Sequence, residues 1–103
     1  MKGFQLVFST LQNRKHPNGE HISHWLVETA EKNGIKGVTI LNASQGIGRD
    51  GKLHASTFFE LAEEPLEVIM NVTEAECEKL FALLAEEKLG LFYTKTAIEF
   101  GTI

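Results

Sequence analysis

The feature that most constrains this chain is a hydrophobic pattern that changes period twice and then repeats both changes in the same order. Period-two alternation is typical of a β-strand, and apolar residues at intervals of three and four are typical of an amphipathic helix. The pattern predicts strand, helix, strand, a long connection, and then strand, helix, strand again. The predicted strands are residues 4–11, 37–43, 66–72 and 91–100, and the predicted helices are residues 20–33 and 73–89.

Each predicted helix has an apolar stripe that supplies a candidate core. The stripe residues are Ile22, Trp25, Leu26 and Ala30 in the first helix, and Cys77, Leu80, Phe81 and Leu84 in the second. Thr73 and Glu76 have the spacing of a capping box, which predicts where the second helix begins.

The order βαββαβ predicts an α+β, ferredoxin-like sandwich, in which two helices cover one face of an antiparallel four-stranded sheet. The chain has 103 residues, which corresponds to one domain spanning residues 1–103. The predicted strands carry apolar residues on both faces, since Val7, Leu11, Leu41 and Ile69 alternate with the residues expected to face the helices. We therefore expect the face without helices to be buried against other copies in a closed ring.

The charge balance and the hydropathy exclude several partners. The formal net charge is −4, with no basic stripe, so nucleic acid is not an expected partner. The single cysteine cannot form an internal disulfide, and no apolar run approaches the roughly 18 residues of a membrane span. These observations predict a cytoplasmic protein.

A long connection between the second and third predicted strands, residues 44–65, is the main candidate for function. It opens with three glycines in six residues, at positions 46, 48 and 51. Loops of this length in small domains usually bind something or are disordered.

The second strand and this connection resemble the corresponding parts of the nitrogen-regulatory PII proteins. The resemblance rests on Gly37-Val38-Thr39, on Gly46-Ile47-Gly48-Arg49 and on the extended segment that follows. It is closer to an uncharacterised PII-like family, through Met1-Lys2-Gly3, Leu53-His54-Ala55-Ser56 and Gly90-Leu91. Membership implies a homotrimer, small-ligand clefts between subunits, and a flexible loop that signals to a target protein or membrane transporter.

The resemblance also implies a set of ligand-binding residues. Gly37, Val38 and Thr39 would contact an adenine and ribose, and Gly46, Gly48 and Arg49 would lie near phosphates. Glycines let backbone amides approach an anion, and a guanidinium matches phosphate geometry. The same glycines also fit a bulge where the strand turns into the loop.

Departures from the PII pattern favour an AMP-like or ADP-like effector over a triphosphate. The turn after the second helix is only residues 86–90, and Pro65 replaces the lysine expected before the third strand. Residues 44–65 contain no tyrosine, so uridylylation is not expected. The candidate cations for a phosphate are Arg49, Lys52, Lys88 and Lys95, although Lys52 and Lys88 equally suit a solvated surface.

The histidines support an alternative function, a trimeric metal-binding or metal-tolerance protein. His21 and His24 are three residues apart, which places both rings on one side of a helix. A polar helix face explains the same pair without a metal. An enzyme is the third class, and it is not predicted, because Cys77 lies on an apolar stripe and His54 with Ser56 does not specify a catalytic set.

Overall fold

The computed structural model describes residues 1–42, 45–47, 53–55 and 65–103. Along the chain the elements are β1 (Lys2–Leu11), α1 (Ile22–Lys32), β2 (Val38–Asn42), β3 (Gln45–Ile47), β4 (Leu53–Ala55), β5 (Pro65–Thr73), α2 (Glu74–Glu87) and β6 (Phe92–Glu99). The two predicted helices and the four predicted strands are all present, each within two residues of its predicted boundaries.

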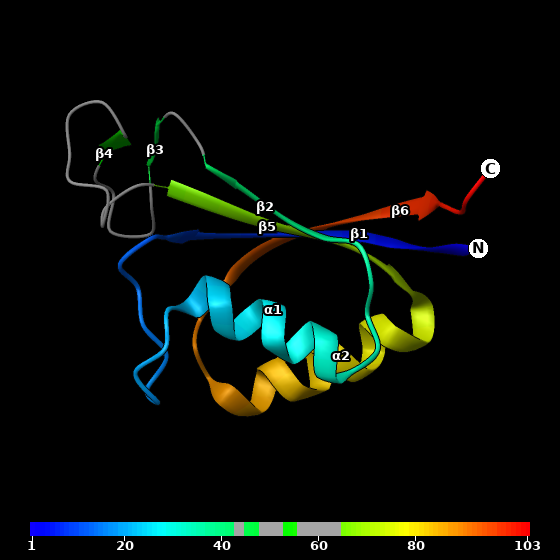
Figure 1. Ribbon diagram of the computed structural model, residues 1–103, viewed down its shortest axis with the longest axis horizontal. Coiled ribbons are helices and arrows are strands. Elements are labelled where there is room, and N and C mark those ends of the chain that lie inside the picture. The colour runs from blue at the N-terminus through cyan, green and yellow to red at the C-terminus, as the bar shows by residue number, and fades with distance from the viewer. Residues whose placement is uncertain (43–44, 48–52, 56–64) are drawn as a thin grey trace.

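The four long strands form one antiparallel sheet in the order β2-β5-β1-β6. Figure 1 shows the sheet nearly edge-on, with α1 and α2 both on one side of it. This arrangement confirms the ferredoxin-like fold. Among the described residues, β2 and β6 are the two edges of the sheet, and one face of the sheet carries no helix.

The core lies between the sheet and the helices, as the apolar stripes predict. Buried strand residues alternate with half-buried ones along β1 and β5, so every second side chain enters the core. The core residues are Leu6, Phe8, Ile22, Leu26, Ala30, Ile35, Val68, Met70, Val72, Cys77 and Leu80. Trp25, Phe81 and Leu84 pack against its margin.

The predicted capping box begins α2. The Thr73 hydroxyl accepts a hydrogen bond from the Glu76 backbone N–H at 3.2 Å, and Glu76 Oε1 accepts one from the Thr73 N–H at 2.9 Å. Two otherwise unpaired backbone donors are thus satisfied where β5 turns directly into the helix.

The strand register places the other set of side chains on the open face. Thr39 of β2 lies opposite Ile69 of β5, Ile69 opposite Val7 of β1, and Val7 opposite Thr94 of β6. In the next row Leu41 lies opposite Glu67. The open face therefore carries the aliphatic residues that the alternation predicted, interspersed with hydroxyl, amide and carboxylate groups.

The long connection contains one feature that the sequence pattern did not predict. β3 and β4 pair antiparallel as a small separate ladder, with Gly46 opposite His54. In Figure 1 this ladder lies beyond the end of the main sheet where β2 finishes and β5 starts. Neither helix of the described segments combines the length and the apolarity that crossing a bilayer requires.

Candidate ligand-binding site

The first candidate segment, Gly37 to Thr39, lies at the start of the edge strand β2. Gly37 has φ +74°, a conformation that side-chain-bearing residues rarely adopt, so glycine is required by the backbone and not by crowding. Val38 is half-buried opposite Met70, and Thr39 is exposed opposite Ile69 on the open face. In the described part of the chain β2 pairs only with β5, so its outer edge presents unpaired backbone groups.

The second candidate segment is the base of the long connection. Gly46 lies in the middle of β3 and is paired with His54 of β4. Gly48, Arg49 and Lys52 lie outside the described residues.

The third candidate, Lys88, is the C-cap of α2, in the left-handed conformation with φ 52°. It is exposed. The residues on either side of Lys88 contact the loop between β1 and α1. The Arg14 guanidinium donates a hydrogen bond to the Leu89 carbonyl, and His16 Nε2 lies 3.2 Å from Glu87 Oε2. The turn that presents Lys88 is therefore held on both sides.

Within one chain these candidates do not converge. Gly37 to Thr39 belong to one edge strand, whereas Lys88 precedes β6, the strand at the opposite edge. The β3–β4 ladder and the end of α2 do lie at the same end of the molecule in Figure 1.

Lys95, another candidate cation, lies on the helix side of β6 among aromatic rings. Its ammonium is 4.1 Å from the centroid of the Phe4 ring and 5.7 Å from that of Phe81. Phe81 is also in contact with Tyr93, with centroids 4.9 Å apart. Cation–π contact gives Lys95 a role in packing that does not involve a phosphate.

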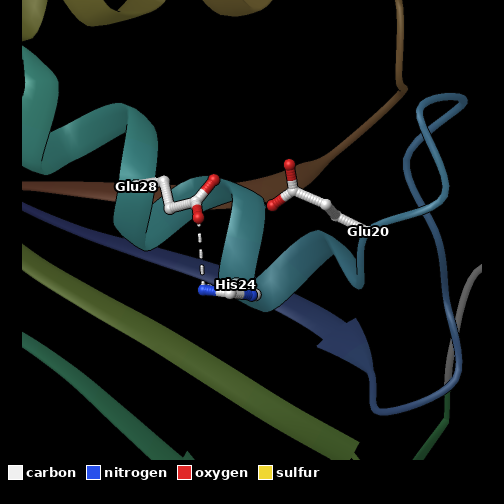
Figure 2. A group of neighbouring side chains, drawn as sticks. All are labelled: Glu20, His24 and Glu28. Carbon is white, nitrogen blue, oxygen red and sulfur yellow. Dashed lines mark ion pairs between the residues drawn. The ribbon is translucent and has the colours of Figure 1, made fainter.

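The two candidate metal-binding histidines have different partners. The His21 Nδ1–H donates to the Gln12 carbonyl at 2.8 Å, which fixes that ring against the preceding loop. His24 is exposed, and its Nε2 is 3.3 Å from Glu28 Oε1. Figure 2 shows Glu20 and Glu28 on either side of His24. One ligand atom from each of these three residues lies within 4.8 Å of the other two.

The sequence-based prediction did not include Glu20 and Glu28, because it rested on the spacing of the two histidines. A signal for Glu28 was present, because it lies four residues, about one helical turn, after His24; Glu20 precedes α1, where this spacing does not apply. The prediction also missed Arg14 and His16, whose contacts with the end of α2 join segments over seventy residues apart.

Cys77, the single cysteine of the chain, is buried in the core. Burial raises the pKa of its thiol; the Lys95 charge opposes this and the Glu78 charge adds to it. A buried neutral thiol is a packing residue and not an activated nucleophile.

Comparison with known proteins identifies the family and the fold. The model of the family DUF190 (Uncharacterized ACR, COG1993) matches residues 7–97. No protein with a curated description matches the chain.

Two solved structures of CPII, a nitrogen regulatory PII-like protein from Thiomonas intermedia K12, have the same fold. One, bound to ADP, AMP and bicarbonate, aligns with TM-score 0.68 and 16% identity over 98% of this chain and 97% of that one. The other, bound to ADP and bicarbonate, aligns with TM-score 0.70 and 15% identity over 99% and 91% of the two chains.

Proposed function

The chain belongs to the DUF190 family, and from this membership and its PII-like fold we propose that it is a regulatory protein that binds an adenine nucleotide between the subunits of a homotrimer. The proposal includes a signalling role for residues 44–65. The observation that carries it is that Gly37 to Thr39 lie at one edge strand of the sheet, whereas Lys88 precedes the strand at the opposite edge.

A ring of subunits brings these edges together. In a head-to-tail ring the β2 side of one subunit faces the β6 side of the next, so each junction combines Gly37 to Thr39 with the neighbour's Lys88. The open face, with Val7, Leu41 and Ile69, supplies apolar surface for the same assembly. Oligomerisation also suits a 103-residue domain, whose own core is small.

The chemistry at such a junction fits a nucleotide with one or two phosphates. The unpaired backbone groups along the edge of β2 can hydrogen-bond an adenine, and the Thr39 hydroxyl can reach a ribose. The Lys88 ammonium supplies one cation for a phosphate, with Arg49 as the second candidate. AMP and ADP match this modest positive charge better than ATP, and the solved CPII complexes contain ADP and AMP.

The proposed signal passes through the position of the long connection. Residues 44–65 begin two residues after the end of β2 and rejoin the sheet at β5. A ligand that touches both Thr39 and the loop base stabilises one loop arrangement, and a target protein or membrane transporter then recognises that arrangement.

Calorimetric titration of the metal-stripped protein with AMP, ADP and ATP, with and without bicarbonate, tests the binding step. We expect saturable binding of AMP or ADP near one per subunit. Lys88→Gln is expected to weaken binding by roughly tenfold or more, the value of a charge-assisted hydrogen bond. Lys79→Gln, an exposed lysine on α2, is the control and should bind normally.

Mixed trimers test whether the site spans two subunits. Thr39→Asp and Lys88→Glu are each expected to abolish binding while keeping the trimer. When the two variants are unfolded and refolded together, about a quarter of the junctions combine two intact halves by random assembly, so about a quarter of the sites should return. Absence of any nucleotide binding by the wild-type protein, or of recovery in the mixture, contradicts the proposal.

A further inference from the structure

We propose that Glu20, His24 and Glu28 form a binding site for a divalent transition-metal ion of the Zn²⁺ type on the surface of α1. This site is separate from the proposed nucleotide junction. It uses one imidazole nitrogen and two carboxylates from a single stretch of chain, so it is complete within one subunit.

Two of the three residues lie on one face of α1. His24 and Glu28 are one helical turn apart on α1, and Glu20 lies in the loop just ahead of the N-cap His21. In Figure 2 the carboxylates of Glu20 and Glu28 point toward each other, and the His24 ring lies below them in the view. One ligand atom from each residue lies within 4.8 Å of the others.

The distance between two of the ligand atoms already matches that of a loaded site. Ligand atoms bonded at about 2.1 Å to one tetrahedral Zn²⁺ lie roughly 3.4 Å apart. The distance between His24 Nε2 and Glu28 Oε1 is already 3.3 Å. Glu20 supplies the third ligand atom, within 4.8 Å of the other two, and a water molecule can take the fourth position on the solvent side.

Glu20 supplies an independent observation that points to a cation. Its backbone N–H donates to Asn18 Oδ1 at 2.9 Å, and its Oε1 accepts from Asn18 Nδ2 at 3.2 Å, so this carboxylate is held in place. Its other oxygen, Oε2, is buried and has no hydrogen-bond partner among the described residues. An unpaired buried carboxylate oxygen destabilises a fold, and a bound cation would remove that cost.

The donor set determines the class of ion. Mg²⁺ and Ca²⁺ prefer oxygen ligands alone, whereas imidazole together with carboxylate suits Zn²⁺ and neighbouring transition metals. The ion pair between His24 and Glu28 does not oppose metal binding appreciably. Both side chains are exposed, and exposed ion pairs contribute little stability.

Titration of untagged, metal-stripped protein with Zn²⁺ by calorimetry tests the site. We expect saturable Zn²⁺ binding, a loss of at least tenfold in affinity in His24→Gln, and a smaller loss in Glu20→Gln and in Glu28→Gln. The controls are His21→Gln, whose ring is bonded to the Gln12 carbonyl, and Glu31→Gln, an exposed glutamate later on α1. Both controls should bind Zn²⁺ as the wild type does.

A melting experiment gives a second readout. Zn²⁺ binding to the folded state should raise the Tm of the wild type and of His21→Gln, but not that of His24→Gln. The proposal is wrong if the Glu20, His24 and Glu28 variants bind Zn²⁺ like the wild type, if the wild type binds none, or if Mg²⁺ binds as tightly as Zn²⁺.

Discussion

The imidazole of His16 stacks on the indole of Trp25, with ring centroids 4.6 Å apart and an interplanar angle of 23°. The same ring accepts a hydrogen bond at Nδ1 from the Asn18 N–H at 3.0 Å, so its neutral form carries the proton on Nε2, which faces Glu87. One side chain thereby joins the β1–α1 loop, helix α1 and the end of α2 beside Lys88.

Replacing His16 by alanine is expected to lower the free energy of unfolding by about 1–2 kcal/mol, since it removes an aromatic pair and two hydrogen bonds. Urea denaturation measures the change. His24→Ala, measured with EDTA present, is the control. The His24 ring is exposed, so its removal should change the free energy of unfolding little. Equal stability of the two variants would show that the His16 contacts contribute nothing.

Gly3 is expected to be intolerant of any side chain. A Cβ built there would lie 1.9 Å from the Val72 carbonyl oxygen, a backbone atom that cannot yield without opening the β1–β5 pairing. Gly3→Ala should therefore lower the free energy of unfolding by at least about 2 kcal/mol. Thermal melts of both variants measure the change. Gly101→Ala, where a Cβ meets nothing within 4 Å, should have nearly the stability of the wild type.

Ile69 tests the proposed assembly through the open face. It lies mid-strand in β5 on that face, between Thr39 and Val7. Ile69→Lys should reduce the particle mass in light scattering to one third of the wild-type value, because a burial cost for the ammonium opposes association. Glu78→Lys, which changes an exposed residue in the helix layer, should leave the wild-type mass unchanged. A wild-type protein with the mass of one chain would contradict the trimer.

Cys77 should make stability fall at alkaline pH. Burial raises the pKa of its thiol above the reference value of 9.0, so the folded state holds the proton more tightly than the unfolded state does. The contribution of this thiol to the stability of the folded state is fully present below pH 9, and it is lost as the pH rises through the folded-state pKa. Urea midpoints from pH 7 to 10 should decline more steeply in the wild type than in Cys77→Ala, and alkylation of native protein at pH 8 should be slow. Rapid alkylation of native protein would show that the thiol is accessible.

The secondary structure could be predicted because each pattern depends on a short stretch of chain. Alternation in β1 and the apolar stripe of α1 follow from backbone periods of 2 and 3.6, and the Thr73–Glu76 capping box spans a single helical turn. The open-face position of Val7 and Ile69 follows in the same way, since alternate strand residues point to opposite faces. The β3–β4 ladder was not predicted because three-residue strands carry too little periodicity.

The candidate site was predictable only in part. Gly37 and Thr39 were predicted from the resemblance and Lys88 from its positive charge. That the strand after Lys88 lies at the edge opposite β2 depends on the strand order β2-β5-β1-β6, which no local pattern encodes. Glu20 was missed because it precedes α1, where helical spacing alone does not orient a side chain. Its orientation depends on Asn18 in the loop before it.

The sequence by itself determined the type and order of the two helices and the four strands of the main sheet, and the side of each that faces the core, because these depend on local backbone geometry and on the burial of apolar side chains. Only the tertiary structure decided which segments meet. It placed His16 between Trp25 and Glu87, held the turn that carries Lys88, and brought two carboxylates to His24, because such contacts depend on packing and hydrogen bonding between groups whose relative positions exist only in the folded chain.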